Sequence, residues 1–324
     1  MSELRFNPTT GEWIVTATHR QERTFFPSPG FCPLCPTKDK EFETEIPLNN
    51  YDIAVFENKF PSFKPIPEEP AIEGDSLFKV DKSFGICEVV CYTDEHDLTF
   101  ADLSFEQIYK LILVWKERFN DISRDKRIKF IYIFENKGEE IGVTLTHPHG
   151  QIYAFPYIPP IPAKEIRRAK KHYKKNGRCL FCDILSAELA AGTRIIEARD
   201  DFIAFLPFYA RYPYEVHIYS KKHLVSISEF DEDICIDLAH ILKNTAQRYD
   251  SLFGFSLPYM MVMHQLPKNG DNSIYYHFHI EFYPPYRSKD KLKYLASVES
   301  GAGTFINDSL PEEKAEELRR LVIH

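Results

Sequence analysis

The sequence predicts an α+β protein built from two copies of one unit of sheet and helix. Three features lead to this prediction. A Cys-x-x-Cys pair, a helical pattern of apolar residues and a His-x-His strand occur in this order in residues 32–149, and again in residues 179–279. Such ordered self-similarity is typical of an internal duplication. We therefore expect two domains, residues 1–160 and residues 161–324.

The first copy is preceded by a short strand pair in residues 4–17, whose turn contains Asn7, Pro8 and Gly11. A Cys-x-x-Cys knuckle, apolar strands, one helix and the histidine strand follow. The predicted elements are the knuckle at 32–35, strands at 53–58 and 85–92, a helix at 102–119, a strand at 129–134 and the strand after His149.

The second copy begins after a Pro-rich crossover at 156–162. His96 and His223 are 127 positions apart and His147 and His277 are 130 apart, whereas Cys32 and Cys179 are 147 apart. The spacing is therefore nearly constant after one early change of length. The repeated elements are the knuckle at 179–182, strands at 201–206 and 214–220, a helix at 231–252 and the strand at 276–282.

The histidine strand of the first copy reads His147-Pro148-His149-Gly150-Gln151. In an extended backbone, residues two apart project from the same face, so both imidazoles and the Gln151 amide lie together. Pro148 has no backbone N–H to donate, which places the pair at a strand entrance or a sheet edge. Two close histidines are also common as ordinary surface residues, and the rest of the chain has to decide between these interpretations.

Composition excludes several classes of function. The 324 residues carry a formal net charge of −8, which argues against nucleic acid as the main partner. The basic run at 164–178 is expected to be a solvated helix face. The N-terminus has no apolar leader and no span of about 18 apolar residues occurs, so we expect no membrane association and a cytoplasmic location. Seven cysteines in that compartment indicate metal ligands or free thiols.

The repeat collects scattered cysteines and histidines into two equivalent sets. Two thiolates and two imidazoles are a preferred set for a structural, four-coordinate zinc. One Cys-x-x-Cys alone would fit buried thiols equally well, but two matching sets favour metal. The predicted ligands are Cys32, Cys35, His96 and His147 in the first copy, and Cys179, Cys182, His223 and His277 in the second. A rival second site, of Glu165, His264, His277 and His279, would suit a harder metal such as iron.

These motifs resemble the galactose-1-phosphate uridylyltransferase family, which belongs to the histidine-triad superfamily. The resemblance rests on the His-Pro-His-Gly-Gln motif, on Phe134-Glu-Asn-Lys-Gly138, on Cys32-x-x-Cys35 and on the sequence from His277 to Pro285. It implies two histidine-triad-like units, each an antiparallel half-barrel sheet with packed helices. It also implies a homodimer that exchanges UDP-glucose and galactose 1-phosphate for glucose 1-phosphate and UDP-galactose.

The resemblance assigns the chemistry to His149, because a neutral imidazole is a competent nucleophile near pH 7. His149 would form a covalent uridylyl-histidine, and Gln151 would donate to a phosphoryl oxygen as charge develops. In the second copy Ile280 and Glu281 follow His279, so a single active centre is expected.

The resemblance also implies further substrate-binding residues, for each of which ordinary surface polarity remains an alternative. They are Arg20, Arg23, Asn58, Asn136, Gly142, Val143, Thr144, Lys293, Val298 and Glu299. Phe305 stands where some family members have a glutamine that contacts the hexose, which leaves hexose selectivity open.

Two other functions compete with uridylyl transfer. One is an enzyme resembling ADP-glucose phosphorylase, in which phosphate accepts AMP from the histidine. That branch tends to carry serine where Pro148 and Gly150 stand here. The other is a non-catalytic, zinc-containing protein that binds nucleotides, which would form no covalent adduct.

Overall fold

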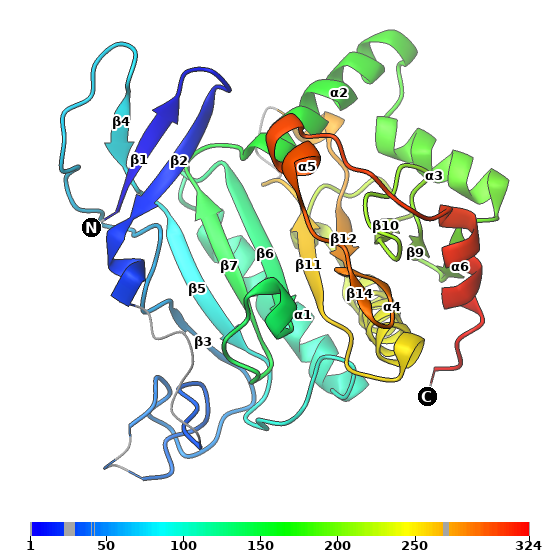
Figure 1. Cartoon of the computed structure of the whole chain (residues 1–324), viewed down its shortest axis with the longest axis horizontal. Coiled ribbons are helices and arrows are strands. Elements are labelled where there is room, and N and C mark those ends of the chain that lie inside the picture. Colours follow the sequence, from blue (N-terminus) through cyan, green and yellow to red (C-terminus); the bar gives the residue numbers. More distant parts are fainter. Residues whose placement is uncertain (1, 23–29, 40, 42, 268–271, 324) are drawn as a thin grey trace.

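The main feature of the fold is a nine-stranded antiparallel sheet with the order β3-β5-β7-β6-β11-β12-β10-β9-β8. Figure 1 shows the computed structural model, which describes residues 2–22, 30–39, 41, 43–267 and 272–323. The strands of this sheet are β3 (Ala54–Glu57), β5 (Ile86–Cys91), β6 (Phe130–Lys137), β7 (His149–Phe155), β8 (Ile195–Ala198), β9 (Phe202–Phe205), β10 (Val216–Ser220), β11 (Tyr259–His264) and β12 (His279–Tyr283).

Smaller elements flank this sheet. A three-stranded sheet contains β1 (Ser2–Asn7), β2 (Glu12–Ala17) and β4 (Val80–Lys82), and a hairpin contains β13 (Tyr286–Ser288) and β14 (Lys291–Leu292). The helices are α1 (Phe105–Ile122), α2 (Pro160–Asn176), α3 (Leu180–Ala191), α4 (Glu232–Phe253), α5 (Ser297–Ala302) and α6 (Pro311–Arg319). The 3-10 turns are η1 (Thr18–Glu22), η2 (Glu139–Ile141), η3 (Ile227–Glu229) and η4 (Ser273–Tyr275).

The sheet contains the same strand pattern twice. The first half has the order β3-β5-β7-β6 and the second has the order β9-β10-β12-β11, with β8 added at the outer edge. The two patterns meet where β6 pairs with β11, at Phe134 opposite Val262. The predicted α+β class with antiparallel sheets is confirmed. The sequence did not show that the two half-sheets join into one.

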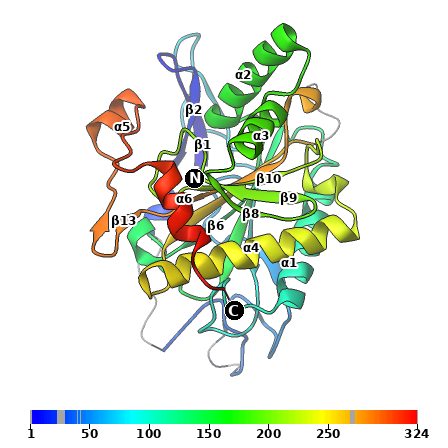
Figure 2. The same ribbon diagram turned by 90° about the vertical axis from the view of Figure 1, so that its right-hand side faces the viewer.

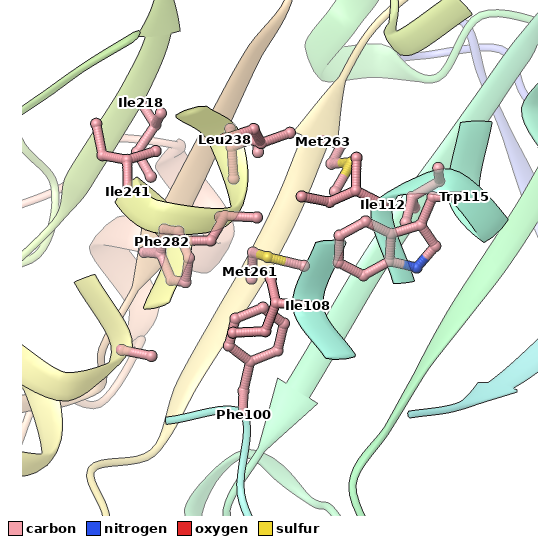
Figure 3. Packing of buried hydrophobic residues seen from close by; sticks show 14 of the residues in the cluster. Phe100, Ile108, Ile112, Trp115, Ile218, Leu238, Ile241, Met261, Met263 and Phe282 are labelled. Carbon is pink, nitrogen blue, oxygen red and sulfur yellow. The ribbon is translucent and has the colours of Figure 1, made fainter. Parts of the chain in front are cut away.

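Helices α1 and α4 pack together on one face of the sheet (Figure 2). Their apolar side chains meet those of the central strands, as Figure 3 shows for Ile112 and Trp115 of α1, Leu238 of α4, and Met261 and Met263 of β11. One buried cluster therefore crosses the junction between the two halves. Burial of apolar surface is the main favourable contribution to folding, so this cluster stabilises both copies as one body.

Both long helices begin later than their apolar pattern predicts, because a polar residue caps each of them. Ser104 Oγ accepts a hydrogen bond from Gln107 N at 3.1 Å, so α1 begins at Phe105 and not at residue 102. Asp231 Oδ1 accepts from Ile234 N at 2.9 Å, so α4 begins at Glu232. Within the described ranges, no helix is both long and apolar enough to cross a membrane.

The opposite face of the sheet differs between the halves. In the second half, α2 and α3 cover it: Ile166, Phe181 and Leu185 pack against Ile203 and Phe205 of β9. In the first half, the equivalent face of β5 and β7 is not covered by a helix among the described elements, and the loop residues Leu34, Ile46 and Tyr51 pack beside it. This difference decides where a ligand has access to the histidine strands.

Candidate active site and metal clusters

His149 is the first residue of β7, and the backbone carbonyl of His147 sets the tautomer of its ring. The Nδ1 atom lies 2.7 Å from the carbonyl oxygen of His147, and a carbonyl only accepts, so Nδ1 carries the proton. Nε2 then carries the lone pair. Tyr92 N donates to Pro148 O at 3.0 Å, which ties the entrance of β7 to β5. The ring is therefore held with an unprotonated Nε2, the atom that is available to act as a base or a nucleophile.

Two cavities meet at His149 and Gln151. The larger, of about 390 Å³, has apolar walls that include Leu34, Phe56 and Val89. The smaller, of about 150 Å³, is mostly polar. Residues predicted to bind substrate line both cavities. Asn58 lines the larger cavity, Thr144 lines both, and the smaller cavity is lined by Arg20, Asn136, Gly142 and Val143. The structure thus brings seven of the predicted substrate-binding residues, counting Gln151, to one place.

Hydrogen bonds hold several of these side chains. Asn58 Nδ2 donates to Gln151 Oε1 at 3.2 Å, which uses the amide oxygen of Gln151 and leaves the donor function on its nitrogen. Arg20 Nη1 donates to Phe60 O at 3.2 Å and to Ser62 Oγ at 3.0 Å. The guanidinium is therefore fixed as a positive charge at the smaller cavity, where a phosphate would be stabilised.

Four other predicted residues are not at this place. Arg23 lies outside the described residues. Lys293, Val298 and Glu299 line none of the cavities described at His149; Lys293 Nζ and Glu299 Oε1 are 3.5 Å apart, and Val298 is 43% exposed. Phe305, at the position of the family's glutamine, packs against Tyr212 with ring centroids 6.2 Å apart.

The four predicted ligands of the first copy converge. Cys35 Sγ lies 3.4 Å from His96 Nδ1 and 3.6 Å from His147 Nδ1, and the ligand atoms of all four residues, Cys32 included, lie within 4.8 Å of one another. In a tetrahedral zinc site, with Zn–S of about 2.3 Å and Zn–N of about 2.0–2.1 Å, a sulfur and a nitrogen ligand are about 3.6 Å apart. The donor set and its spacing therefore fit zinc.

The second copy has the same arrangement. Cys182 Sγ lies 3.5 Å from His223 Nδ1 and 3.6 Å from His277 Nδ1, and with Cys179 these atoms form a second group within 4.8 Å. In both copies the other ring nitrogen, Nε2, is bonded to a backbone carbonyl, and this holds Nδ1 toward the thiols. His147 Nε2 lies 2.8 Å from Thr93 O, and His277 Nε2 lies 2.8 Å from Ser220 O. Each Nε2 therefore carries the proton, and each Nδ1 has a lone pair for a metal.

The predicted ligand set of the rival second site, Glu165, His264, His277 and His279, is wrong in one residue. His277 belongs to the Cys179 cluster, and the third group consists of Glu165, His264, His279 and Glu281. Side chains two apart on β12 share a face, so His279 and Glu281 point to the same side, while His277 lies before β12 begins. The sequence contained a signal for Glu281, because the offset of 130 places it at the position of Gln151.

The third group is deeply buried. His279 Nδ1 donates to His277 O at 2.8 Å, whereas His279 Nε2 has no hydrogen-bond partner among the described residues. Glu281 Oε1 lies 3.6 Å from that nitrogen, and Glu165 Oε2 lies 3.0 Å from His264 Nδ1. A buried, unpartnered imidazole nitrogen surrounded by carboxylates and a second imidazole fits a divalent cation such as iron.

Family models match both halves of the chain. The model described as "Galactose-1-phosphate uridyl transferase, N-terminal domain" matches residues 1–159, and that of the C-terminal domain matches residues 165–324. The chain belongs to the galactose-1-phosphate uridylyltransferase family. Its predicted family and enzyme class are thereby confirmed.

Relatives in this family match along almost the whole chain. The galactose-1-phosphate uridylyltransferase of Thermotoga maritima is 42% identical over 320 residues, which cover 98% of both chains. A solved structure entitled "Structure of uridylyltransferase" superposes with a TM-score of 0.86 at 36% identity and covers 98% of this chain and 97% of that one. An ADP-glucose phosphorylase from Arabidopsis thaliana has a TM-score of 0.75 at 24% identity, with both chains fully covered, and shares the fold.

Proposed function

We propose that this protein is a UDP-glucose–hexose-1-phosphate uridylyltransferase that acts through a covalent uridylyl-His149. The observation that carries the proposal is the combination of the His149 tautomer with the access of its ring to two cavities. Its Nδ1 proton is held by the His147 carbonyl at 2.7 Å, so Nε2 is the nucleophile beside two cavities. The 42% identical relative is named for the same activity.

In the first half-reaction, His149 Nε2 attacks the α-phosphorus of UDP-glucose. The N–P bond forms, the bridging P–O bond breaks, and glucose 1-phosphate leaves with the bond's electron pair. The His147 carbonyl stabilises the positive charge that the ring acquires. Gln151, whose oxygen is engaged by Asn58, donates from its nitrogen to a phosphoryl oxygen.

In the second half-reaction, a phosphate oxygen of galactose 1-phosphate attacks the same phosphorus. The N–P bond breaks, its electron pair returns to Nε2, and UDP-galactose is released. One pocket serves both sugar phosphates because each is present only after the other has left. Arg20, Asn136, Gly142, Val143 and Thr144 suit the phosphates and the sugar, and the apolar cavity with Asn58 suits the nucleoside; Arg23 is assigned with them by resemblance alone.

Zinc fits both Cys₂His₂ clusters, in which Cys32, Cys35, His96 and His147, and Cys179, Cys182, His223 and His277, would hold it. With all four positions filled by protein, such an ion supplies rigidity and no open coordination position. His147 precedes the nucleophile by two residues, so the first cluster anchors the strand that carries His149. Iron suits Glu165, His264, His279 and Glu281, where it would compensate buried carboxylates.

We further propose that the active form is a homodimer. Lys293, Val298 and Glu299 lie away from the cavities of their own chain, and the neighbouring Tyr294 is 75% exposed. A second copy would allow this segment to reach a sugar phosphate. Mixing inactive His149→Ala and Lys293→Ala subunits should then restore part of the activity, and no restoration would contradict a shared site. The domain boundary at residue 160 and the cytoplasmic location stay predictions.

Intact mass tests the proposal against its alternatives. UDP-glucose without acceptor should add one UMP, which galactose 1-phosphate should remove, and His149→Ala should add nothing. An AMP-sized gain from ADP-glucose that phosphate releases would favour the phosphorylase. Absence of any adduct in folded, metal-loaded protein would favour a binding protein.

A further inference from the structure

Glu135 is a buried carboxyl directly behind the reactive strand. It lies on β6 between Phe134 and Asn136, and is 4% exposed. Neighbouring residues of a strand point to opposite faces, so Asn136 faces the smaller cavity with His149 while Glu135 faces the side of α1 and α4. Glu135 Oε1 accepts a hydrogen bond from Tyr259 Oη at 3.2 Å.

The other oxygen of this carboxyl lacks a partner. Within the described residues, neither Glu135 Oε2 nor the Tyr92 hydroxyl has a hydrogen-bond partner, although both are buried. Burial raises the pKa of Glu135, while Lys137 and the nearby hydroxyls of Tyr259 and Tyr92 lower it in part. Leaving two buried polar groups unsatisfied is unfavourable, so a slight shift that lets the phenol donate to the carboxylate is favoured.

The Tyr92 hydroxyl also lies close to Gly150, the residue between His149 and Gln151. A Cβ atom at position 150 would lie 2.1 Å from Tyr92 Oη and 2.9 Å from Phe134 O. The Tyr92 ring is itself held against Trp115 of α1, with ring centroids 6.0 Å apart. In the described part of the chain, Tyr92 therefore lies against the backbone of the reactive residues and near the buried Glu135 carboxyl, with no hydrogen bond between the phenol and the carboxyl.

The second copy provides an internal comparison. At the offset of 130, Gln265 stands at the position of Glu135 and Ile280 at that of Gly150. Gln265 is fully buried and accepts from Ile227 N at 3.0 Å. The half that lacks the Gly-Gln sequence thus also lacks the carboxyl and the close contact of a phenol with glycine.

We propose that Glu135 is a positioning residue for uridylyl transfer, which acts through Tyr92 to fix the backbone of Gly150 and thereby the aim of His149 and Gln151. We assign Glu135 no contact with the substrate, because its side chain is buried and bonded to Tyr259. This inference rests on the proposed function, because it concerns the rate at which His149 takes up UMP. Misplacing a reacting group by about 1 Å can cost roughly 100-fold in rate, so a small displacement of Gly150 suffices.

The test measures the rate of adduct formation at saturating UDP-glucose, the KM for UDP-glucose and the unfolding temperature. Glu135→Leu should lower the rate about tenfold or more with KM changed less than about twofold, since it affects aim and not binding. Tyr92→Phe should also lower the rate, by about threefold or more. Glu135→Gln should recover most of it, because an amide can bond both phenols.

Gln265→Leu is the matched control, since it removes an equally buried polar group in the other copy. It should lower the unfolding temperature but leave the rate of adduct formation within about twofold. Equal rate losses in Gln265→Leu and Glu135→Leu, or unchanged rates in both Glu135→Leu and Tyr92→Phe, would overturn the inference. A wild-type protein that forms no adduct would instead overturn the proposed function and, with it, this role of Glu135.

Discussion

The two histidine strands have the same local geometry and very different surroundings. His149 Nδ1 donates to His147 O at 2.7 Å, and His279 Nδ1 donates to His277 O at 2.8 Å, so both rings have the same tautomer. His149 is half-buried and lines cavities, whereas His279 is fully buried. The tautomer alone therefore does not distinguish a reactive histidine from an unreactive one. The two copies differ in whether a substrate can reach the ring.

Helices α2 and α3 are responsible for the difference. Phe181 of α3 lies over His279 with ring centroids 5.1 Å apart, and Glu165 of α2 reaches His264. No helix of the described residues covers the equivalent face of the first half. The proposed reaction site thus lies where the sheet face is open, and a cluster suited to metal lies where two helices close it.

The largest expected effect comes from removing His149, and removal of its counterpart His279 is the comparison. His149→Ala should lower the rate of UMP transfer by at least about 10³-fold, because the covalent route is lost. His279→Ala should form the adduct at nearly the wild-type rate and bind less metal. Intact mass and metal analysis distinguish the two. Loss of the adduct in both variants would refute the distinction between an open and a closed copy.

Gly150→Ala should lower the transfer rate by about 100-fold, because its Cβ would lie 2.1 Å from Tyr92 Oη and the strand must move. Combining it with Tyr92→Phe removes that oxygen and should restore part of the rate, leaving the contact with Phe134 O at 2.9 Å. Rapid-quench kinetics give both values. Substituting Ile280 by Ala in the second copy is the control and should leave the rate unchanged.

Cys35→Ser and Cys182→Ser test whether the two Cys₂His₂ clusters act separately. Each removes a direct ligand, so each should weaken zinc binding at its own cluster by more than the roughly 10–100-fold that loss of an outer-shell partner costs, and leave the other cluster loaded. Only Cys35→Ser should also slow adduct formation, because His147 shares its cluster with Cys35 and precedes His149 by two residues. Zinc stoichiometry and adduct rates measured on the same samples check this. Equal slowing in both variants would show a general effect on stability.

The smallest effect concerns pH. Burial raises the pKa of Glu135 from 4.5 to about 7, whereas Gln265 in the other copy does not titrate. Between these two values the folded state binds more protons than the unfolded state, so stability falls as pH rises through this window. The loss should be of order 2 kcal/mol in the free energy of unfolding. Denaturant unfolding at pH 5 and pH 7.5 should show this loss in the wild type and not in Glu135→Gln; an equal loss in both proteins would assign the titration to other groups.

The sequence by itself determined the duplication, both Cys₂His₂ sets, the pairing of His149 with Gln151 and the family. These features depend on spacing along the chain: a Cys-x-x-Cys turn and a His-x-His strand each place two side chains close together, and the repeat identifies the distant members. Seven of the substrate residues named from the resemblance also meet at the cavities.

Only the tertiary structure decided the rest. Glu281, and not His277, joins Glu165 and His264. This depends on the pairing register of β12 with β11 and on which face of the sheet α2 covers. That Tyr92 restricts position 150, with Glu135 behind it, depends on the register of β5, β6 and β7. That Lys293 and Val298 lie away from the cavities depends on where the C-terminal segment packs. The physical reason is common to all three: strand register and helix cover are set by burial of the whole core, and no local pattern of residues encodes them.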